Sequence, residues 1–524
     1  MSGRSPSPTL KGDDTPRTRS DDASRSPTSF EKNAIPSSAP RPNDIEKALQ
    51  QGKEEAGLSF EVKFSGDEDP RSPKSLSTLR KWSIVLIVSS TSLCVACTSS
   101  LYTGTYAQVM EEFGSDLTVT TLGLSMFVVG LGLSPMILAP LSEFYGRKPV
   151  YVMSTLVFFI WIIPCAVAQN IQTLVIARFL DGFAGAAFLS VAGGTVGDLF
   201  PRGKLQKPMM IYTASPFLGP ELGPVISNFI NYNVNWRWTF WVLLIWTGVQ
   251  LLLIISLVPE TYMPVLLRRE AVKLRKETGE ERWYAPIEKM DRSIPQTLMR
   301  SCYRPFLLLT LEPMCLCLCM FCAFVLGVLY LFFGAFNIVF TKNHGFNLWQ
   351  VGLSFLGILI GMLIGIGSDS FWYKNYQRLL RQHEERTGEV GGSEPEYRLP
   401  PAILGAPLIV VGLLWFGWTS YASIHWIVPI IGSAFFGCGS VPPSSGQSLP
   451  LTQISTILIF SGVFTFLVDS YPLYAASALA ANSFARSMFA AMFPLFGDAM
   501  YNNLGYQWAT FILAMITLAL APFP

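Results

Sequence analysis

Charged side chains inside long apolar segments are the first candidates for chemistry in this sequence. Arg178 and Asp181 stand three residues apart in RFLDGFAGAAF, close enough to neutralise each other along one helix face, and Glu221 lies in FLGPELGPVI. A charge is costly in an apolar environment, so a residue kept there is a candidate for function. A desolvated carboxyl group can hold and release a proton near neutral pH. We expect Arg178, Asp181 and Glu221 to couple a process to proton movement.

Four further residues are candidates for the wall of a ligand cavity: Glu312, Tyr330, Asn482 and Arg486. Tyr330 belongs to the aromatic run LYLFF, and aromatic rings suit an apolar or cationic organic ligand. The alternatives are structural. The rings could form a lipid-facing or interfacial belt, and Arg178 and Arg486 could hold helices together through hydrogen bonds to carbonyl groups.

The sequence offers little for a metal or a nucleotide. Four cysteines stand close together, but no histidine joins them and thiolates are costly in hydrocarbon; they are Cys315, Cys317, Cys319 and Cys322. The nucleotide-binding motif GxxxxGK[ST] does not occur, which argues against ATP as the energy source. We expect no metal, no cofactor, no catalytic residue and no enzymatic activity, with a proton gradient as the energy source.

Composition predicts that lipid is the solvent for these groups. Half of the residues are hydrophobic and 14% are charged, against about a quarter charged in soluble domains. The apolar residues form blocks of about 20, the length that crosses roughly 30 Å of hydrocarbon. This pattern predicts an all-α integral membrane protein that crosses the bilayer many times. Because the net charge is +2 and the basic residues form no stripe, we expect no nucleic-acid partner.

Hydropathy predicts two groups of six spans around a polar connector. The spans cover 83–106, 119–141, 149–169, 174–199, 209–231 and 239–258, then 308–334, 349–368, 402–420, 425–468 (interrupted), 474–498 and 506–524. The predicted domains are a disordered tail over 1–80, a six-helix bundle over 81–259, a linker over 260–304 and a second six-helix bundle over 305–524. Two related six-helix halves are typical of transporters built from repeats.

Basic residues predict the orientation. They gather in the loops after even-numbered spans, as at Arg147, Lys148, Lys204 and Arg378. The positive-inside bias therefore predicts that both termini are cytoplasmic. We expect a monomer in the plasma membrane, in contact with lipid, protons and a small-molecule substrate.

One segment breaks the pattern of spans. The sequence SVPPSSGQSLPLTQIS at 440–455 interrupts what would otherwise be one span. Each flank is too short to cross alone, and a polar loop at bilayer depth would leave backbone groups without partners. We interpret the segment as a retained intron, with a re-entrant loop as the alternative. The chain also stops at Pro522-Phe523-Pro524 without a basic tail, which we interpret as a C-terminal truncation.

Small residues predict close contacts between helices. In the fifth span, Gly219 and Gly223 alternate with Pro220 and Pro224, which could bend the helix. The eighth span repeats glycine every four residues, at Gly357, Gly361 and Gly365. Both patterns predict faces on which a neighbouring helix approaches closely and can slide.

Several motifs resemble those of one family. PLSEFYGRKPV, between the second and third spans, resembles the first signature of the major facilitator superfamily: Glu143 stands at the acidic position, and Gly146, Arg147 and Lys148 match. Ala139 and Phe144 depart from that signature. DPRSPKSLSTLRKW, WRWTFW, PETY and YPLYAASALAANSFARS are similar to segments of the superfamily's fungal twelve-span drug:proton antiporters, which include multidrug and polyamine exporters.

This resemblance implies a major facilitator fold of two six-helix bundles with pseudo-two-fold symmetry. It also implies a cytoplasmic charge lock, in which Glu143 and Arg147 engage Asp198 at the end of the fourth span. Arg178 matches the buried arginine that the family links to proton transfer. The fifth-span pattern Gly219, Pro220, Gly223 and Pro224 matches a signature that antiporters carry and most symporters lack.

We therefore predict proton-coupled efflux of small organic molecules, such as drugs, toxins, secondary metabolites or polyamines, by alternating access. One alternative is a proton symporter or facilitator that imports a nutrient such as sugar. The other comes from a different class: a non-transporting sensor, or an inactive product of mis-splicing.

Overall fold

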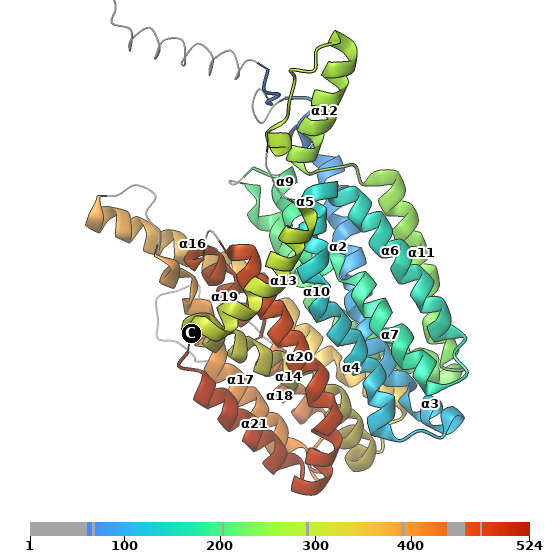
Figure 1. Cartoon of the computed structure of the whole chain (residues 1–524). Helices are drawn as coiled ribbons and strands as arrows, with labels where there is room; N and C mark the ends of the chain where they lie inside the picture. Colours follow the sequence, from blue (N-terminus) through green and yellow to red (C-terminus); the bar gives the residue numbers. More distant parts are fainter. Residues whose placement is uncertain are drawn as a thin grey trace, which may run out of the picture. The chain divides into compact units, whose positions relative to one another are not determined.

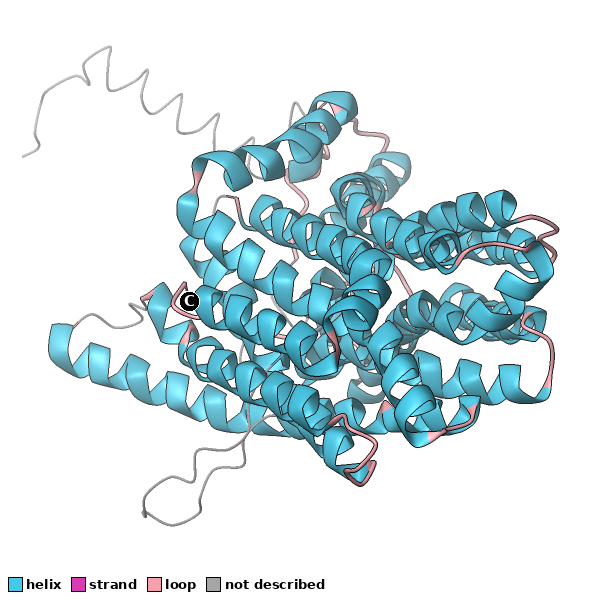
Figure 2. Cartoon of the chain, turned by 90° about the horizontal axis from the view of Figure 1, so that it is seen from below, coloured by secondary structure: helices cyan, strands magenta, loops and turns pink. Residues whose placement is uncertain are grey.

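The protein is described by a computed structural model over residues 60–64, 69–201, 204–289, 293–388, 394–437, 456–471 and 474–523. Within these ranges the regular elements are helices, and the one strand-like feature is an isolated bridge between Glu61 and Tyr284 (Figure 2). The predicted all-α fold is confirmed.

The first half of the protein runs from α2 to α11 and is drawn from blue to green in Figure 1. Its helices are α2 (Thr78–Leu101), α3 (Tyr106–Phe113), α4 (Leu117–Leu133), α5 (Pro135–Tyr145), α6 (Arg147–Ala166), α7 (Ile171–Gly185), α8 (Ala187–Ser190), α9 (Ala192–Leu199), α10 (Gln206–Asn233) and α11 (Arg237–Leu257). Side chains start two of them: Asp116 accepts a hydrogen bond from the Thr118 amide, and Asn170 accepts one from the Thr173 amide.

The second half runs from α14 to α21 and is drawn from yellow to red. Its helices are α14 (Pro313–His344), α15 (Leu348–Ser354), α16 (Leu356–Thr387), α17 (Pro400–Thr419), α18 (Ile427–Gly437), α19 (Thr456–Ser470), α20 (Ala475–Leu504) and α21 (Tyr506–Leu520). The break between α14 and α15 has Gly345 in the left-handed region, at φ 65°, where a glycine costs least.

Twelve spanning segments can be assigned from these helices. By length and apolar composition, seven described helices suffice to cross a membrane, and the bent pair α4–α5 would be an eighth, with 41° between its two parts. The other four segments are α10 and α20, which are long enough but less apolar, the shorter α21, and the pair α18 and α19. On α11, the side chains of Ile245 and Leu252 are 66% and 68% exposed, as expected of a surface that faces lipid.

The two halves repeat one packing plan. In the first half α10 packs on α2, α4 on α7, α6 on α7, and α11 on α6. In the second half the equivalent pairs are α20 on α14, α16 on α18, α17 on α18, and α21 on α17. The halves meet through two pairs that the same symmetry relates, α4 with α20 and α10 with α15 and α16. This repetition is the pseudo-two-fold symmetry that the family resemblance implied.

The connector between the halves contains two helices, α12 (Met263–Thr278) and α13 (Ile294–Leu311). The end of the linker predicted at 304 and the start of the seventh span predicted at 308 are therefore wrong in position. α13 continues to Leu311, and Glu312 separates it from α14. The proline at the start of α14 explains the break, because a residue before proline is disfavoured in the helical region. α13 packs against α5, α14 and α20, so it touches both halves.

The end of the predicted disordered tail is ordered where the structure describes it. The Val62 amide donates a hydrogen bond of 3.0 Å to the Tyr284 carbonyl, and the rings of Phe60 and Trp283 lie 5.5 Å apart, edge to face. Residues 60–64 thus pack against the linker, and the prediction of disorder up to residue 80 is wrong for this part. Residues 1–59 lie outside the described residues.

The tenth span is divided between α18 and α19, of 11 and 15 residues. The hydroxyl of Thr456 donates a hydrogen bond of 2.8 Å to the Phe436 carbonyl, so the two helices meet where a continuous span would join them. The segment 440–455, which we interpret as a retained intron, lies outside the described residues.

Deletion of residues 440–455 should stabilise the protein, because neither flank reaches the roughly 20 residues that cross a bilayer and the joined helix does. We expect a higher midpoint of thermal unfolding for the purified protein in detergent. A deletion that lowers the midpoint or prevents membrane insertion would show that the segment belongs to the native fold.

The contact between α2 and α10 depends on two glycines. A Cβ added to Gly223 would lie 2.8 Å from the Leu101 nitrogen and 2.9 Å from the Cys97 oxygen, both backbone atoms. A Cβ on Gly219 would lie 2.5 Å from that of Ala96. The backbones of the two helices thus approach too closely for any side chain at these positions. The close contact predicted from the glycine pattern of the fifth span is present.

Gly223→Ala should lower the free energy of unfolding by about 1–3 kcal/mol, as overpacking does in a close-packed contact. Gly334→Ala is the matched control, because Gly334 lies inside α14 and a Cβ there meets nothing within 4 Å. Thermal unfolding of both purified variants measures the difference. Equal midpoints for the two variants would contradict the close approach of α2 and α10.

Candidate functional site

A cavity of about 1250 Å³ lies between the two halves. Phe217 of α10 lines it from the first half, and Tyr330 of α14 and Arg486 of α20 line it from the second. The exposed side chains of Glu143 and Arg300 line it on the side of the connector, which we call the linker side. The cavity is therefore accessible from the linker side.

The halves are in contact at the end of the bundles opposite the linker side. A Cβ added to Gly352 of α15 would lie 3.0 Å from both the Pro224 oxygen and the Asn228 Cβ on α10. The rings of Phe229 and Trp349 lie 5.9 Å apart at the same contact. The described residues thus form a conformation in which the cavity opens on one side of the bundles and the halves meet at the other.

Arg178 is fully buried and binds three helices at once. Its Nη2 donates to the carbonyls of Thr98 (3.0 Å) and Ser99 (3.2 Å) on α2, and its Nε donates to that of Gly123 (3.4 Å) on α4. Its Nη1 lies 3.7 Å from the Asp181 carboxylate, one turn along α7. Neither Asp181 oxygen has a hydrogen-bond partner among the described residues. The pairing expected from the sequence spacing is present, but it is an ion pair without a hydrogen bond.

Ser99 links this buried group to the cavity. Its hydroxyl lies 2.7 Å from the Ala96 carbonyl and 2.9 Å from the Tyr330 hydroxyl. Since the single Ser99 hydroxyl proton is used on Ala96, the Tyr330 hydroxyl donates to Ser99. Ser99 thus presents its carbonyl to Arg178 and its hydroxyl oxygen to Tyr330, a residue of the opposite half that lines the cavity.

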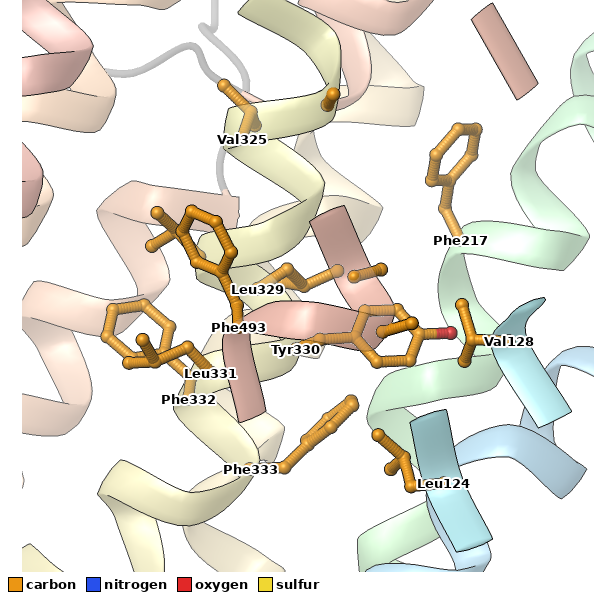
Figure 3. Close-up of a cluster of buried hydrophobic side chains, with 14 of the residues drawn as sticks. Leu124, Val128, Phe217, Val325, Leu329, Tyr330, Leu331, Phe332, Phe333 and Phe493 are labelled. Atoms are coloured by element: carbon orange, nitrogen blue, oxygen red, sulfur yellow. The ribbon is translucent and has the colours of Figure 1, made fainter. Parts of the chain in front are cut away.

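Tyr330 lies among apolar side chains from both halves. Figure 3 shows its hydroxyl end directed at the first half beside Val128, with Phe217 on one side and Leu124 and Phe333 on the other. The rings of Tyr330 and Phe333 lie 5.2 Å apart, edge to face. This packing holds the phenol in place while its hydroxyl remains available to polar groups.

Glu221 is a second buried carboxylate, on α10. It is fully buried, and neither of its oxygens has a hydrogen-bond partner in the part of the chain that the structure describes.

A second charged group lies at the linker side, around Arg147 at the start of α6. Its guanidinium lies 3.4 Å from the Asp198 carboxylate and donates a hydrogen bond of 2.6 Å to the Ser142 hydroxyl. Glu260 holds the backbone here: its Oε1 accepts from the Arg147 amide (2.9 Å) and its Oε2 from the Lys148 amide (3.3 Å). A carboxylate at a helix N-terminus satisfies free amides and complements the helix dipole. Gly146, at φ 98°, lets the chain turn there against Glu260.

Over residues 88–457 the sequence matches the family model described as the Major Facilitator Superfamily. The chain belongs to this superfamily. It is 66% identical over 465 residues to "Efflux pump atB" of Aspergillus terreus, which covers 89% of this chain and 86% of that protein. It is 38% identical over 476 residues to "Probable drug/proton antiporter YHK8" of Saccharomyces cerevisiae, which covers 90% and 88%.

The fold of the superfamily is also found in solved structures. The xylose transporter XylE from E. coli, in a partially occluded inward open conformation, superimposes with a TM-score of 0.56 at 16% identity, over 84% of this chain and 98% of that chain. This likeness concerns the fold alone. Members of the superfamily are transporters, so the protein is a multi-pass membrane transporter and not an enzyme.

The charge lock that the resemblance implied differs in one residue from the expected Glu143, Arg147 and Asp198. Arg147 and Asp198 pair as the resemblance implied, but Glu143 forms no ion pair among the described residues and is exposed at the cavity mouth. The second carboxylate of the group is Glu260, which sequence reasoning noted only as part of PETY. The ammonium group of Lys148 donates a hydrogen bond of 3.0 Å to the Ile255 carbonyl. The group joins α6, α9 and the start of the linker, so it lies within the first half.

The predicted cavity residues separate into two pairs. Tyr330 and Arg486 line the cavity. Glu312 does not; it is exposed between α13 and α14, and its carboxylate accepts a hydrogen bond of 3.4 Å from the Tyr471 hydroxyl. Asn482 is fully buried in α20, and its side-chain amide has no hydrogen-bond partner among the described residues. Glu312 and Asn482 therefore lie outside the cavity.

The fifth-span signature divides its residues between two neighbours. Gly219 and Gly223 face α2, whereas Pro220 lines the cavity and the Pro224 carbonyl meets Gly352 of α15.

In the cysteine run of α14, the sulfur atoms of Cys315 and Cys319 lie 3.9 Å apart. Among the described residues no group of three or more His, Cys, Asp or Glu side chains could hold a metal ion.

Glu260→Gln should destabilise the linker side by about 1–2 kcal/mol. The glutamine oxygen can replace only one of the two carboxylate oxygens that accept from the Arg147 and Lys148 amides, and the helix terminus loses its negative charge. Thermal unfolding and hydrogen exchange at the start of α6 measure the loss. Glu143→Gln is the matched control and should change neither. If Glu143→Gln lowered the stability and Glu260→Gln did not, Glu143 and not Glu260 would be the second carboxylate of the charge lock.

Proposed function

We propose that the protein exports small organic molecules in exchange for protons by alternating access. The observation that supports this most is the connection from the cavity wall to the buried ion pair: Tyr330 to Ser99, Ser99 to Arg178, and Arg178 to Asp181. A change of charge at Asp181 can reach the cavity through one ion pair and two hydrogen bonds. Two relatives, one named as an efflux pump and one as a probable drug/proton antiporter, favour export over import.

The structure suggests distinct parts for the buried charges. Arg178 remains charged and is already bound by carbonyls, so it acts as a fixed centre. The carboxylate oxygens of Asp181 and Glu221 accept no hydrogen bond from any described residue, and we propose that these two groups carry the transported proton. Because Glu221 has no counter-charge at hydrogen-bond distance among the described residues, its ionised form needs water or a partner that another conformation supplies.

A proton gradient is sufficient as the energy source, and we propose that no cofactor takes part. Each proton that enters down a potential of 100 mV releases about 2.3 kcal/mol, and each unit of pH gradient adds about 1.4 kcal/mol. A gradient of 1.4 kcal/mol corresponds to a tenfold concentration ratio, so one proton can drive substantial accumulation outside.

We propose that the linker side is cytoplasmic, in agreement with the basic loops, and that the protein is a monomer in the plasma membrane with both termini inside. The described conformation would then be the one that receives substrate from the cytoplasm.

Reconstituted vesicles test the direction of coupling. Purified protein is inserted into vesicles, which are given fluorescein, coumarin or rhodamine 123 in turn, and protein-free vesicles are subtracted. Uptake of a dye driven by an acidic interior supports antiport. Uptake driven by an acidic exterior would instead establish the symport alternative, and inserted protein that moves none of the dyes would favour the non-transporting alternative.

Glu221→Gln should reduce gradient-driven uptake by about tenfold or more, because the amide cannot exchange a proton across the apolar bundle. Exchange of labelled for unlabelled dye across the membrane, which needs no net proton movement, should continue. Glu312→Gln is the matched control, since Glu312 is exposed outside the cavity, and should keep both activities. A Glu221→Gln variant with unchanged gradient-driven uptake would remove Glu221 from proton coupling.

A further inference from the structure

The charges that line the cavity are unequal in sign. Seven charged residues line it, five arginines and two carboxylates: Arg147, Arg300, Arg304, Arg398 and Arg486, with Glu143 and Asp469. Two of the arginines have carboxylate partners, since Arg147 pairs with Asp198 and Arg398 lies 2.9 Å from Asp469. Three arginines remain without an acidic partner among the described residues.

Arg486 is the most informative of the three. It lies on α20, where its guanidinium faces the rings of Phe464 (4.7 Å) and Phe460 (5.2 Å) of α19. It forms no hydrogen bond or ion pair with any described residue, and its Nε is buried without a partner. Arg178 offers the contrast, because three carbonyls and a carboxylate surround it. Arg486 is thus a guanidinium whose hydrogen-bonding capacity is unused and which faces a cavity.

Arg486 is half-buried, and a cation against an apolar wall is costly to leave without a partner, so a carboxylate that pairs with it offsets part of that cost. The N–H donors of a guanidinium match the two oxygens of a carboxylate. The cavity wall is apolar and aromatic here, because Phe217, Leu329, Tyr330 and Phe464 line it together with Arg486. Behind this wall the buried ring of Phe460 stacks on Phe217 at 4.9 Å. This combination of one fork of donors and several rings suits a flat apolar body that carries a carboxylate.

The remaining two arginines lie on the route into the cavity. Arg300 and Arg304 stand one turn apart on α13, and both line the cavity on the linker side. Basic residues at the mouth of a cleft raise the local concentration of anions and speed their association. Among the described residues, the carboxylates that line the cavity are Glu143, which is exposed on the linker side, and Asp469, which pairs with Arg398. Neither faces Arg486 as an ion pair, so a cationic ligand finds no counter-charge beside that residue.

We infer that the transported substrate is an organic anion, an aromatic or otherwise apolar carboxylate that Arg486 binds through its guanidinium and that Arg300 and Arg304 attract to the mouth. This inference rests on the proposed export function and names the class of its substrate.

The inference has an electrical consequence that a cationic substrate would not have. One anion that leaves while one proton enters carries two positive charges inward in each cycle, whereas exchange of a cation for a proton carries none. For a membrane potential of 100 mV, each charge moved inward per cycle changes the attainable ratio of substrate concentrations across the membrane roughly fiftyfold. Export of an anion is therefore driven by the membrane potential as well as by the pH gradient.

Three probes with one ring system test the binding. They are anthracene-9-carboxylate, the neutral 9-anthracenemethanol and the permanently cationic (anthracen-9-ylmethyl)trimethylammonium, and fluorescence anisotropy measures their affinity for the purified full-length protein. The carboxylate should bind about ten- to hundredfold more tightly than the alcohol, and the cation most weakly. Tightest binding of the cation would overturn the inference.

Variants of Arg486 identify the group responsible. Arg486→Gln should remove the preference for the carboxylate and leave the affinity for the alcohol within about twofold. Arg486→Lys should retain part of the preference, because it keeps the charge without the fork. Arg300→Gln, the matched control, should slow association without changing the preference. Equal weakening of all three probes by Arg486→Gln would make Arg486 a structural residue and overturn its assignment. If the Arg486→Gln variant does not fold, the relative affinities of the three probes for the unmodified protein still test whether the site prefers an anion.

Transport measurements separate this inference from the proposed function. In vesicles without a pH gradient, an imposed potential that is positive inside should increase uptake of anthracene-9-carboxylate, with protein-free vesicles subtracted. Gradient-driven uptake of the cation and not of the carboxylate would overturn the substrate class and leave proton-coupled transport intact. Selective binding of the carboxylate with no transport of any probe would overturn the proposed function and leave the binding site intact.

Discussion

A guanidinium group that cannot reach water must find its partners inside the protein, and Arg178 shows what that requires. Its donors reach the carbonyls of Thr98 and Ser99 on α2 and that of Gly123 on α4, while Asp181 balances its charge on α7. Three helices are thereby held at fixed positions around one point. α10 then packs on α2 through glycine, so the helix that carries Glu221 is placed by the same constraint.

The two halves share a packing plan but use their buried arginines differently. Arg178 is bound within its own half, by three carbonyls and by the Asp181 carboxylate at 3.7 Å, although its Nη1 has no hydrogen-bond partner among the described residues. Arg486, in the other half, touches two aromatic rings and has no hydrogen-bonding partner among the described residues. Symmetry therefore accounts for the arrangement of the helices, and the departures from symmetry mark where the halves have separate chemistry. Tyr330 touches the first half through Ser99, whose carbonyl binds Arg178, and it lines the cavity together with Arg486.

Hydropathy and residue spacing predicted most of the fold, because spans and i, i+3 pairs are local properties of the chain. The pairing of Arg178 with Asp181 and the glycine contact of α10 are of this kind. The bond between Ser99 and Tyr330 was not predicted, since it joins residues 231 positions apart and depends on the rotation of two helices. A signal did exist, in the concentration of Ser and Thr in CTSSLYTGT on an otherwise apolar helix.

Predictions failed where the function of a residue depends on the geometry of a loop. Glu260 follows the sixth span in sequence, yet its carboxylate accepts from the amides at the start of α6, more than a hundred residues earlier. Only the folded loop brings these groups together. For the same reason the linker was read as a polar connector, although an amphipathic helix within it, α13, supplies two arginines of the cavity.

The contacts between the halves indicate how they could separate. The ion pairs of Arg147 with Asp198 and of Arg178 with Asp181 lie within the first half, so rocking of one half against the other need not break them. The contacts that must open are mainly uncharged: the backbone of α10 against Gly352, and the Ser125 hydroxyl on the Ala491 carbonyl at 2.6 Å. Separating such surfaces exposes few charges and costs little compared with breaking a buried ion pair. Among the described residues, the polar contact between the halves that also adjoins a buried charge is the hydrogen bond from Tyr330 to Ser99. It is therefore the place where movement of the halves and the charge of the buried carboxylates can influence each other.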